Sequence, residues 1–404
     1  MITCKDMKKV AILTAGGIAP CLSSAIAALI KEYAKASPDI EVICYRDGYK
    51  GLLLGDSSNV THGVVESVEV LYQFGGSPIG NSRVKLTNVE DCIKRGFVKA
   101  GEIPLNVAAE QLVKDKIDVL HTIGGDDTNG VAADLAKHLK ENGYNLQVIG
   151  LPKTIDNDIV PIAHSLGANT AAEQSALFFE HIVAETTANP KMFIIHEVMG
   201  RKCGWLTAAS ALCYTKRLHE REFIAGLGIS KERYSIHGVY VPEITINLKK
   251  EADRLEQIMK TVGCVNIFVS EGACVDEIVT EMESRRETVV RDAFGHVKLD
   301  SINAGEWFKS QFSKKIGAEK TLVQKSGYFA RSAPSNLFDI ALINDSAEMA
   351  VKCALAGESG VIGLDESHDG QMSCIDFQRI KGGKPFDVAK NSEFVNLLKQ
   401  IGQI

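Results

Sequence analysis

The sequence predicts an α/β protein with mainly parallel sheets that is divided into two domains. The chain has 404 residues, and at about 100–200 residues per domain this length favours two domains with sizeable cores. Short β-rich runs alternate with longer helical patterns, which is the rhythm of βαβ units with parallel strands. Apolar residues make up 45% and charged residues 24%, which is ordinary usage for a globular protein.

The first part of the chain contains three predicted strands, each followed by a predicted helix. The strands are Val10–Thr14, Val119–Ile123 and Val148–Leu151, and the helices are Ser23–Ala36, Asn129–Lys140 and Ala171–Ala184. Because these helices act as crossovers between parallel strands, we expect ligands to gather beyond the carboxyl ends of the strands.

The rhythm continues in the second part of the chain. The predicted strands are Phe193–His196, Val239–Val241, Asn266–Ser270, Leu322–Gln324 and Val361–Leu364, and the predicted helices are Lys249–Thr261, Asn303–Lys315 and Ser346–Leu355. The charged segment Glu277–Arg291 is interpreted as a solvated helical face. The boundary is predicted near Leu166–Ala172, with domains of residues 1–166 and 167–404. Completion of the first domain by a later, returning segment stays open, and the second domain carries a C-terminal extension.

Composition excludes several classes of protein. Lys and Arg total 45 against 51 Asp and Glu, so a formal charge of −6 provides no general field for nucleic acid. No run approaches the roughly 20 apolar residues of a membrane span. The ten cysteines form no C-x-x-C pair, which favours a reduced cytoplasm. A secretory signal at Val10–Ile30 is disfavoured, because Gly16, Gly17 and Pro20 interrupt the apolar run.

The sharpest motif is the run Gly124-Gly125-Asp126-Asp127-Thr128, between a predicted strand and a predicted helix. The glycines permit close approach of the backbone to a ligand, and the first N–H groups of the helix form an anion site. Two adjacent carboxylates would repel phosphate unless a hard cation such as Mg²⁺ lies between them. The alternative is that Asp126 and Asp127 merely cap the helix.

Other glycine turns support an anion site. Gly16-Gly17 follows the first predicted strand, and Arg83, shortly after a further Gly-Gly pair, offers a guanidinium that can fork onto phosphate oxygens. Taken alone, Arg83 is more often a surface residue. The chain has no G-x-x-x-x-G-K-[ST] and no G-x-G-x-x-G, so neither a P-loop nucleotidase nor a dinucleotide fold is predicted.

A cationic residue meets two carboxylates after the strand Val148–Leu151. Lys153, Asp156 and Asp158 lie within the run Pro152–Asp158. Phosphoryl transfer to an alcohol needs a carboxylate that orients the hydroxyl and accepts its proton, and Asp156 or Asp158 fits that requirement. The alternative is an Asx-turn with an exposed lysine.

These motifs together resemble the phosphofructokinases, and specifically their pyrophosphate-dependent branch. The resemblance runs from about Val10 to Asp365 and rests on GGDDT at Gly124–Thr128, PKTIDND at Pro152–Asp158, EVMGRKCGW at Glu197–Trp205, EGA at Glu271–Ala273 and GYFAR at Gly327–Arg331. It implies two Rossmann-like three-layer αβα domains with the active site in the cleft between them. The first would bind the phosphoryl donor and the second the sugar phosphate.

The resemblance also implies a reaction and its residues. Pyrophosphate and fructose 6-phosphate would give phosphate and fructose 1,6-bisphosphate, reversibly, in glycolysis or gluconeogenesis, with Mg²⁺ as cofactor and a homodimer or homotetramer as the assembly. Asp126 would hold the metal. The implied catalytic residues are Asp156, Asp127 and Lys153; the implied sugar-phosphate residues are Thr154, Ile155, Asp156, Asp158, Met199, Gly200, Arg201, Glu271, Tyr328 and Arg331; the implied diphosphate residues are Gly16, Gly17, Arg83 and Gly125.

Two of these positions, Asp127 and Lys153, bear on which phosphoryl donor the protein uses. By this resemblance, the family members that use ATP have glycine in place of Asp127 and a small residue in place of Lys153. A carboxylate at Asp127 would occupy and repel the α-phosphate, while Lys153 supplies charge to the leaving phosphate. The alternatives are an ATP-dependent phosphofructokinase and a noncatalytic regulatory subunit that binds sugar phosphate. Cys21 departs from the family pattern, which usually has glycine there.

Overall fold

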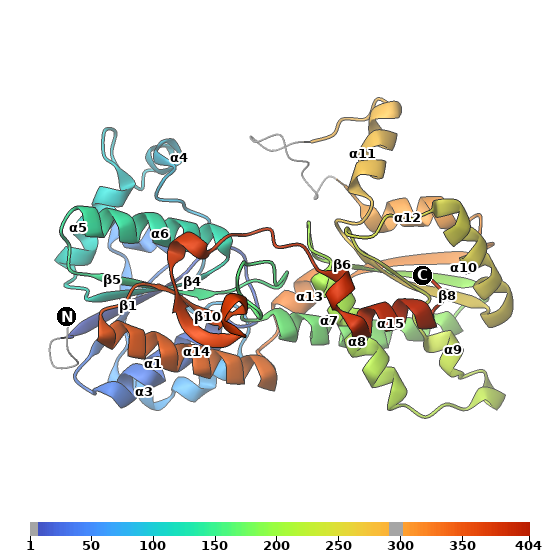
Figure 1. Cartoon of the computed structure of the whole chain (residues 1–404), viewed down its shortest axis with the longest axis horizontal. Coiled ribbons are helices and arrows are strands. Elements are labelled where there is room, and N and C mark those ends of the chain that lie inside the picture. The colour runs from blue at the N-terminus through green and yellow to red at the C-terminus, as the bar shows by residue number, and fades with distance from the viewer. Residues whose placement is uncertain (1–6, 291–301) are drawn as a thin grey trace. The chain divides into compact units, whose positions relative to one another are not determined.

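The computed structural model describes residues 7–290 and 302–404, which form two compact units (Figure 1). The first unit comprises residues 7–170 and 331–384, and the second comprises residues 171–290, 302–330 and 385–404. Each unit is therefore built from segments that are separated along the chain. The functional roles of the two predicted domains stay predictions.

The first unit is organised around a seven-stranded sheet. Its strands, in spatial order, are β11 (Gln371–Ile375), β10 (Gly360–Asp365), β5 (Gln147–Pro152), β4 (Val119–Gly124), β1 (Lys9–Thr14), β2 (Glu41–Tyr45) and β3 (Ser57–Asn59). The pairs from β10 to β2 are parallel, and the two edge strands β11 and β3 are antiparallel to their neighbours.

Helices cover both faces of this sheet (Figure 1). They are α1 (Leu22–Ala36), α2 (Tyr49–Leu54), α3 (His62–Glu66), α4 (Val89–Lys94), α5 (Pro104–Lys114), α6 (Asp126–Glu141) and α14 (Leu337–Ala356). Successive strand residues point to opposite faces, so Val10 and Ile12 pack with α1 and α14, whereas Ala11 and Leu13 pack with α5 and α6. The result is a three-layer αβα unit.

The second unit has a four-stranded, all-parallel sheet. Its strands, in spatial order, are β7 (Gly238–Tyr240), β8 (Cys264–Ser270), β6 (Met192–Val198) and β9 (Lys320–Lys325). Its helices are α7 (Ala168–Ile182), α8 (Trp205–His219), α9 (Lys231–Tyr234), α10 (Leu248–Val262), α11 (Val275–Ser284), α12 (Ala304–Phe312), α13 (Gly327–Arg331) and α15 (Ser392–Gln400). On one face the strands pack with α10 and α12, and on the other lie α7, α8 and α15 (Figure 1).

The last residues of the chain are tied into the second unit by side-chain contacts. Gln403 donates to the carbonyl of Val239 and accepts from its N–H, each at 2.8 Å, and so extends the hydrogen bonding of edge strand β7. Upstream, the N–H of Phe386 donates to Glu243 at 2.9 Å. The predicted C-terminal extension is thus a folded part of this unit from residue 385 onward.

The predicted α/β class with mainly parallel sheets is confirmed, and the differences lie in individual elements. The predicted helix Ser346–Leu355 begins earlier, at Leu337, where the side chain of Asn336 caps it by accepting the N–H of Asp339. Leu337 is 85% exposed, so the first turn breaks the apolar periodicity used for prediction. The strands β2, β3 and β11 and the helices α2–α5 were not among the predicted elements. Of the charged segment, residues 275–284 form α11, and Arg291 lies outside the described residues.

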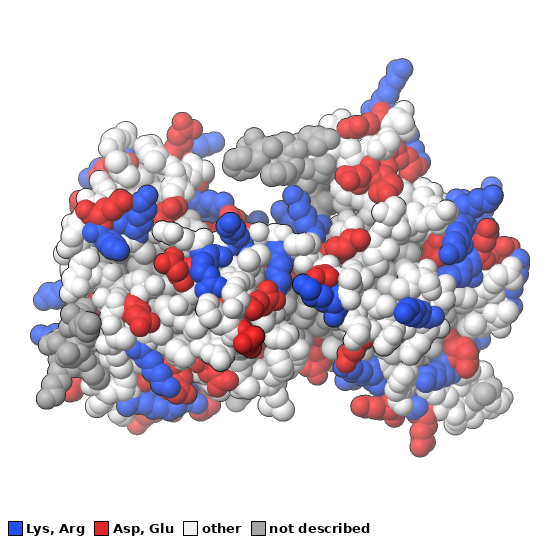
Figure 2. All heavy atoms as spheres, viewed as in Figure 1, with Lys and Arg blue, Asp and Glu red and all other residues white. Residues whose placement is uncertain are grey.

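The charges on the described surface agree with the near balance of basic and acidic residues in the sequence. Figure 2 shows lysine and arginine side chains interspersed with aspartate and glutamate over the face in view. None of the helices in the described ranges has the length and apolar character needed to cross a membrane. The described cysteines are all free thiols, and Cys4 lies outside the described residues.

Buried histidines are expected to make the fold sensitive to acid. Burial lowers the pKa of His196 to about 3, and this ring stacks on Phe179 with neither nitrogen hydrogen-bonded within the described chain. Because the unfolded chain binds this proton below about pH 6.5 and the folded chain does not, stability falls as pH drops below that value, by about 1.4 kcal/mol per pH unit.

We expect His196→Phe to reduce this loss, by about 2 kcal/mol between neutral pH and about pH 5. Urea unfolding followed by tryptophan fluorescence measures it, because both tryptophans, Trp205 and Trp307, lie in the second unit with His196. His62→Gln, on an exposed side chain, is the matched control and should leave the pH dependence unchanged. Equal acid sensitivity of His196→Phe and the parent chain would contradict the argument.

Candidate functional site

Three loops of the first unit meet at the carboxyl ends of neighbouring parallel strands. They follow β1, β4 and β5, and two backbone hydrogen bonds continue the register of the sheet into them. The N–H of Ala15 donates to Ile123 at 3.0 Å, and the N–H of Lys153 donates to Gly124 at 2.8 Å. This edge is where an open parallel sheet collects its ligands.

Lys153 lies at the centre of these loops. It is only 5% exposed, and its ammonium donates to the carbonyl of Gly17 at 2.7 Å. Burial lowers the pKa of Lys153, while the carboxylates of Asp156 and Asp126 act in the opposite direction. The alternative of an exposed lysine is therefore wrong, and the loops contain a buried cationic group.

The loop after β4 requires glycine because the chain approaches itself closely. A Cβ atom at Gly124 would lie 2.3 Å from the side chain of Thr128 in α6. The helix starts at Asp126 with Gly125 as its N-cap, and no side chain provides a capping hydrogen bond. Asp126 and Asp127 are both exposed in the first turn, so they remain available to a ligand.

Asp127 has a partner that the sequence analysis missed. The ammonium of Lys85 lies 2.7 Å from its carboxylate, in an ion pair whose side chains are 46% and 72% exposed. The signal in the sequence was weak, since Lys85 stands two residues beyond Arg83 with no motif of its own. Because both side chains are largely exposed, this ion pair is weak and offsets only part of the charge of Asp127.

The carboxylate run after β5 is held together by Thr154. Its hydroxyl accepts the N–H of Asp156 at 3.1 Å and donates to Asp158 at 3.4 Å. Burial raises the pKa of Asp158, and the nearby carboxylate of Asp126 adds to this shift. Asp126 and Asp158 are therefore two carboxylate oxygen donors near each other, and the charge of Asp126 disfavours ionisation of Asp158.

A segment near the C-terminus closes on the same carboxylates. A Cβ atom at Gly382 would lie 1.9 Å from Oδ2 of Asp126, so the backbone of Gly382 packs directly against that carboxylate. The N–H of Lys384 donates to the carbonyl of Asp158 at 2.9 Å, and Lys381 forms an isolated bridge with Val160. The sequence signal that was overlooked is Lys-Gly-Gly-Lys at 381–384, which has the composition of a phosphate loop.

The remaining predicted diphosphate residues lie beside these loops. A Cβ atom at Gly16 would lie 3.5 Å from the Lys153 ammonium, and one at Gly17 would lie 3.9 Å from the Arg83 guanidinium. Arg83 itself is exposed, and Ile155 is half-buried against the core of the first unit. The first unit therefore brings together Gly16, Gly17, Arg83, Gly125, Asp126, Asp127, Lys153 and the run Thr154–Asp158.

Five of the ten predicted sugar-phosphate residues belong to the second unit, where β6 and β8 end close together. Glu271 accepts the N–H of Gly200 at 3.3 Å, and its own N–H donates to the carbonyl of Val198 at 2.8 Å. Gly200 has φ +137° and a Cβ there would lie 2.6 Å from the Cys203 carbonyl, so only glycine fits. Arg201 is exposed directly after it.

The helix α13 supplies two further predicted residues. Gly327 opens it, and a Cβ atom there would lie 2.7 Å from the terminal methyl of Met199. Tyr328 follows and is 75% exposed. Arg331 is half-buried at the end of the helix, and the division of the chain places it with the first unit. The structure thus brings Met199, Gly200, Arg201 and Glu271 together, and Tyr328 follows Gly327, which contacts Met199.

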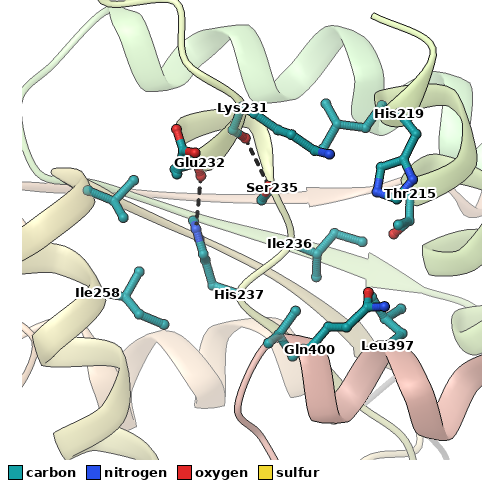
Figure 3. A pocket seen from close by; sticks show the side chains of 13 residues that line it. Thr215, His219, Lys231, Glu232, Ser235, Ile236, His237, Ile258, Leu397 and Gln400 are labelled. Carbon is teal, nitrogen blue, oxygen red and sulfur yellow. Dashed lines mark hydrogen bonds between the residues drawn. The ribbon is translucent and has the colours of Figure 1, made fainter. Parts of the chain in front are cut away.

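The second unit also has a pocket of about 400 Å³ that contains none of these residues. Figure 3 shows it lined by side chains of α8, α9, α10 and α15 and by His237. Both ring nitrogens of His237 already have hydrogen-bond partners. Nδ1 accepts the N–H of Asn266 at 3.0 Å, and Nε2 donates to the carbonyl of Glu232 at 3.1 Å. The pocket lies apart from the candidate site.

Comparison with known proteins finds relatives that match nearly the whole chain. The phosphofructokinase family model matches residues 9–354. A curated protein of Methylotuvimicrobium alcaliphilum named pyrophosphate–fructose 6-phosphate 1-phosphotransferase is 62% identical over 396 residues, covering 98% of this chain and 97% of its own. One of the same name in Mastigamoeba balamuthi is 58% identical over 397 residues, with coverages of 98% and 97%.

A solved structure shares the fold. It is the pyrophosphate-dependent phosphofructokinase of Marinobacter aquaeolei, with a TM-score of 0.71 and 19% identity, covering 98% of this chain and 91% of that chain. At this identity the likeness concerns the fold, and it supports the architecture of two α/β units.

The packing of Gly382 on Asp126 generates a prediction. We expect Gly382→Ala to weaken pyrophosphate binding in the presence of Mg²⁺ roughly tenfold or more, because relieving such a clash costs about 1–3 kcal/mol. Isothermal titration calorimetry measures the affinity. Gly130→Ala is the matched control, since a Cβ atom at that helical position meets nothing within 4 Å. Unchanged affinity in Gly382→Ala would remove the segment 381–384 from the site.

Proposed function

Because the chain belongs to the phosphofructokinase family, we propose that it transfers a phosphoryl group from pyrophosphate to the 1-hydroxyl of fructose 6-phosphate. The products are phosphate and fructose 1,6-bisphosphate. The observation that carries the proposal is the 62% identity over 98% of the chain to a relative named for this activity. The proposal includes a cytoplasmic location, reversible action in glycolysis or gluconeogenesis, and a homodimer or homotetramer.

The donor side of the proposal rests on the loops of the first unit. Pyrophosphate is compact and highly charged, so it needs several cationic or N–H donors close together. Lys153, Arg83, and the free N–H groups that begin α6 after Gly125 supply them. Since Lys153 is already buried and hydrogen-bonded to Gly17, its charge is oriented before the donor arrives.

Magnesium fits the donor set that the first unit offers. Asp126 and Asp158 are two oxygen-donor carboxylates near each other, and Mg²⁺ is typically held by one or two carboxylates together with substrate phosphates. Asp126 would hold the ion, with Asp158 beside it. When bound, the cation neutralises negative charge on the phosphate oxygens.

The acceptor side requires a base for the sugar hydroxyl. Asp156 takes this role in the proposal: its carboxylate orients the 1-hydroxyl and accepts its proton as the phosphoryl group moves. Thr154 is a positioning residue, because its hydroxyl accepts the N–H of Asp156 and fixes the loop. Met199, Gly200, Arg201, Glu271, Tyr328 and Arg331 hold the sugar phosphate, with Glu271 accepting from hydroxyls and the arginines donating to phosphate.

Asp156 provides a direct test of the base. We expect Asp156→Asn to lower kcat by about 10²–10⁴ with little change in KM for fructose 6-phosphate, because a base acts mainly in the transition state. Steady-state kinetics with pyrophosphate and Mg²⁺ measure both constants. Asp369→Asn, at an exposed position with φ +54°, is the matched control and should retain the parent kcat. A normal kcat in Asp156→Asn would exclude it as the base.

The donor argument is tested with both phosphoryl donors. We expect the parent chain to use pyrophosphate and not ATP, because Asp127 fills the space of an α-phosphate. The double variant Asp127→Gly/Lys153→Gly should use pyrophosphate at least about tenfold less well and admit ATP. Turnover of the parent chain with ATP alone would favour an ATP-dependent enzyme.

The control for the double variant is Lys116→Gly/Asp369→Gly. Both positions are exposed and have positive φ, +60° and +54°, which glycine adopts without strain. It should keep the parent's preference for pyrophosphate. Binding of fructose 6-phosphate without turnover under either donor would instead support a regulatory subunit.

A further inference from the structure

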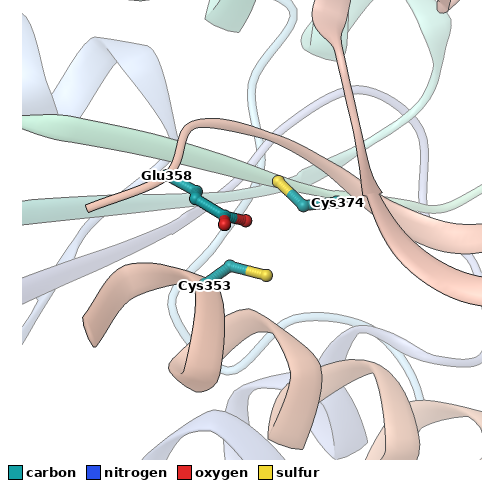
Figure 4. A group of neighbouring side chains, drawn as sticks. All are labelled: Cys353, Glu358 and Cys374. Carbon is teal, nitrogen blue, oxygen red and sulfur yellow. The ribbon is translucent and has the colours of Figure 1, made fainter. Parts of the chain in front are cut away.

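Three side chains with metal-binding atoms converge in the first unit, apart from the site described above. They are Cys353, Glu358 and Cys374, and their two sulfur atoms and one carboxylate oxygen lie within 4.8 Å of one another. Figure 4 shows the three side chains pointing toward a common space. Cys353 is buried, Cys374 is half-buried and Glu358 is exposed.

Each of these side chains stands on a well-defined part of the fold. Cys353 lies in the last turn of α14, which ends at Gly357 with φ +77°. Glu358 follows at once, and its N–H donates to the carbonyl of Cys353 at 2.9 Å. Cys374 lies in β11 directly opposite Ile362 of β10. The helix end, the turn and the edge strand therefore hold the ligands together without a long flexible loop.

The cluster lies at the opposite end of the sheet from the phosphate loops. Glu358 precedes the start of β10, where Gly360 pairs with Ile149 of β5. The donor loops instead follow Gly124 and Pro152, where β4 and β5 end. A ligand at the cluster is therefore separate from the reacting groups.

We propose that Cys353, Glu358 and Cys374 form a zinc-binding site in which water supplies the fourth ligand. Thiolate sulfur favours zinc over the hard cations Mg²⁺ and Ca²⁺. In a tetrahedral site with Zn–S bonds of about 2.3 Å, two sulfur atoms lie about 3.8 Å apart, so the observed grouping needs only small side-chain rotations. On binding, each thiol releases its proton to solvent and the deprotonated sulfur bonds to the metal.

The surroundings support this ligand set. The cluster is beside the C-terminal end of α14, where the helix dipole favours a cation. Exposed Glu358 leaves one side of the site open to water, which suits three protein ligands and one solvent ligand.

The test is a titration of the reduced full-length chain with Co²⁺ and then Zn²⁺, without substrates. We expect one equivalent of Co²⁺ to produce the sulfur-to-cobalt charge-transfer band and the visible bands of tetrahedral cobalt, and Zn²⁺ to displace it. Cys374→Ser should weaken zinc binding more than about 100-fold, since even groups that merely orient a ligand contribute about 10–100-fold. Competition with a chromophoric chelator measures the affinity.

Two further variants test whether zinc binds through Glu358 and through these cysteines specifically. Glu358→Gln, on an exposed side chain that should not affect folding, is expected to weaken zinc binding about tenfold or more while the charge-transfer band remains. Cys213→Ser, a half-buried cysteine of the second unit, is the matched control and should bind like the parent. Absence of a one-equivalent site, equal binding by Cys374→Ser, or oxidation to a disulfide without metal binding would each overturn the proposal. None of these outcomes bears on phosphoryl transfer.

Discussion

The parallel register of β1, β4 and β5 is the constraint on which the proposed donor site depends. Thr14 pairs with Ile123, and Gly124 pairs with Pro152, so the three strands end at the same level. The sheet therefore places the loops that follow side by side, and contacts between the loops then add to this arrangement. Lys153 can then bury its ammonium against a carbonyl of another loop, and the carboxylates that surround it come from two different strand ends.

Much of the fold could be predicted from the sequence, because the strand and helix periods of the long elements are strong. The loop at Gly124–Thr128 could be predicted from its residue types as well, because a Gly-Gly pair beside aspartate has few structural explanations. What the sequence could not show is pairing at long range. Nothing local indicates that Lys85 meets Asp127. The overlooked Lys-Gly-Gly-Lys run at 381–384 gives no sign either that Gly382 packs on Asp126. Such contacts depend on the tertiary arrangement of short loops.

The ion pair between Lys85 and Asp127 bears on how the proposed site would distinguish pyrophosphate from ATP. From the sequence, Asp127 was expected to exclude a nucleotide by both its volume and its charge. With an ammonium 2.7 Å from the carboxylate, part of that charge is offset, so in the proposed function the steric effect would carry more of the discrimination between donors. The same ammonium adds positive charge near the place proposed for pyrophosphate, which favours a small and highly charged donor.

The division of the chain into returning segments has a consequence for biosynthesis. The inner strand β5 is buried along its whole length, yet its neighbour β10 is encoded about two hundred residues later, after most of the second unit. Domains generally fold from the N-terminus as the ribosome releases them. Here a nascent chain carries an apolar, unpaired sheet edge until β10 has been synthesised, which is the kind of surface that chaperones protect from aggregation.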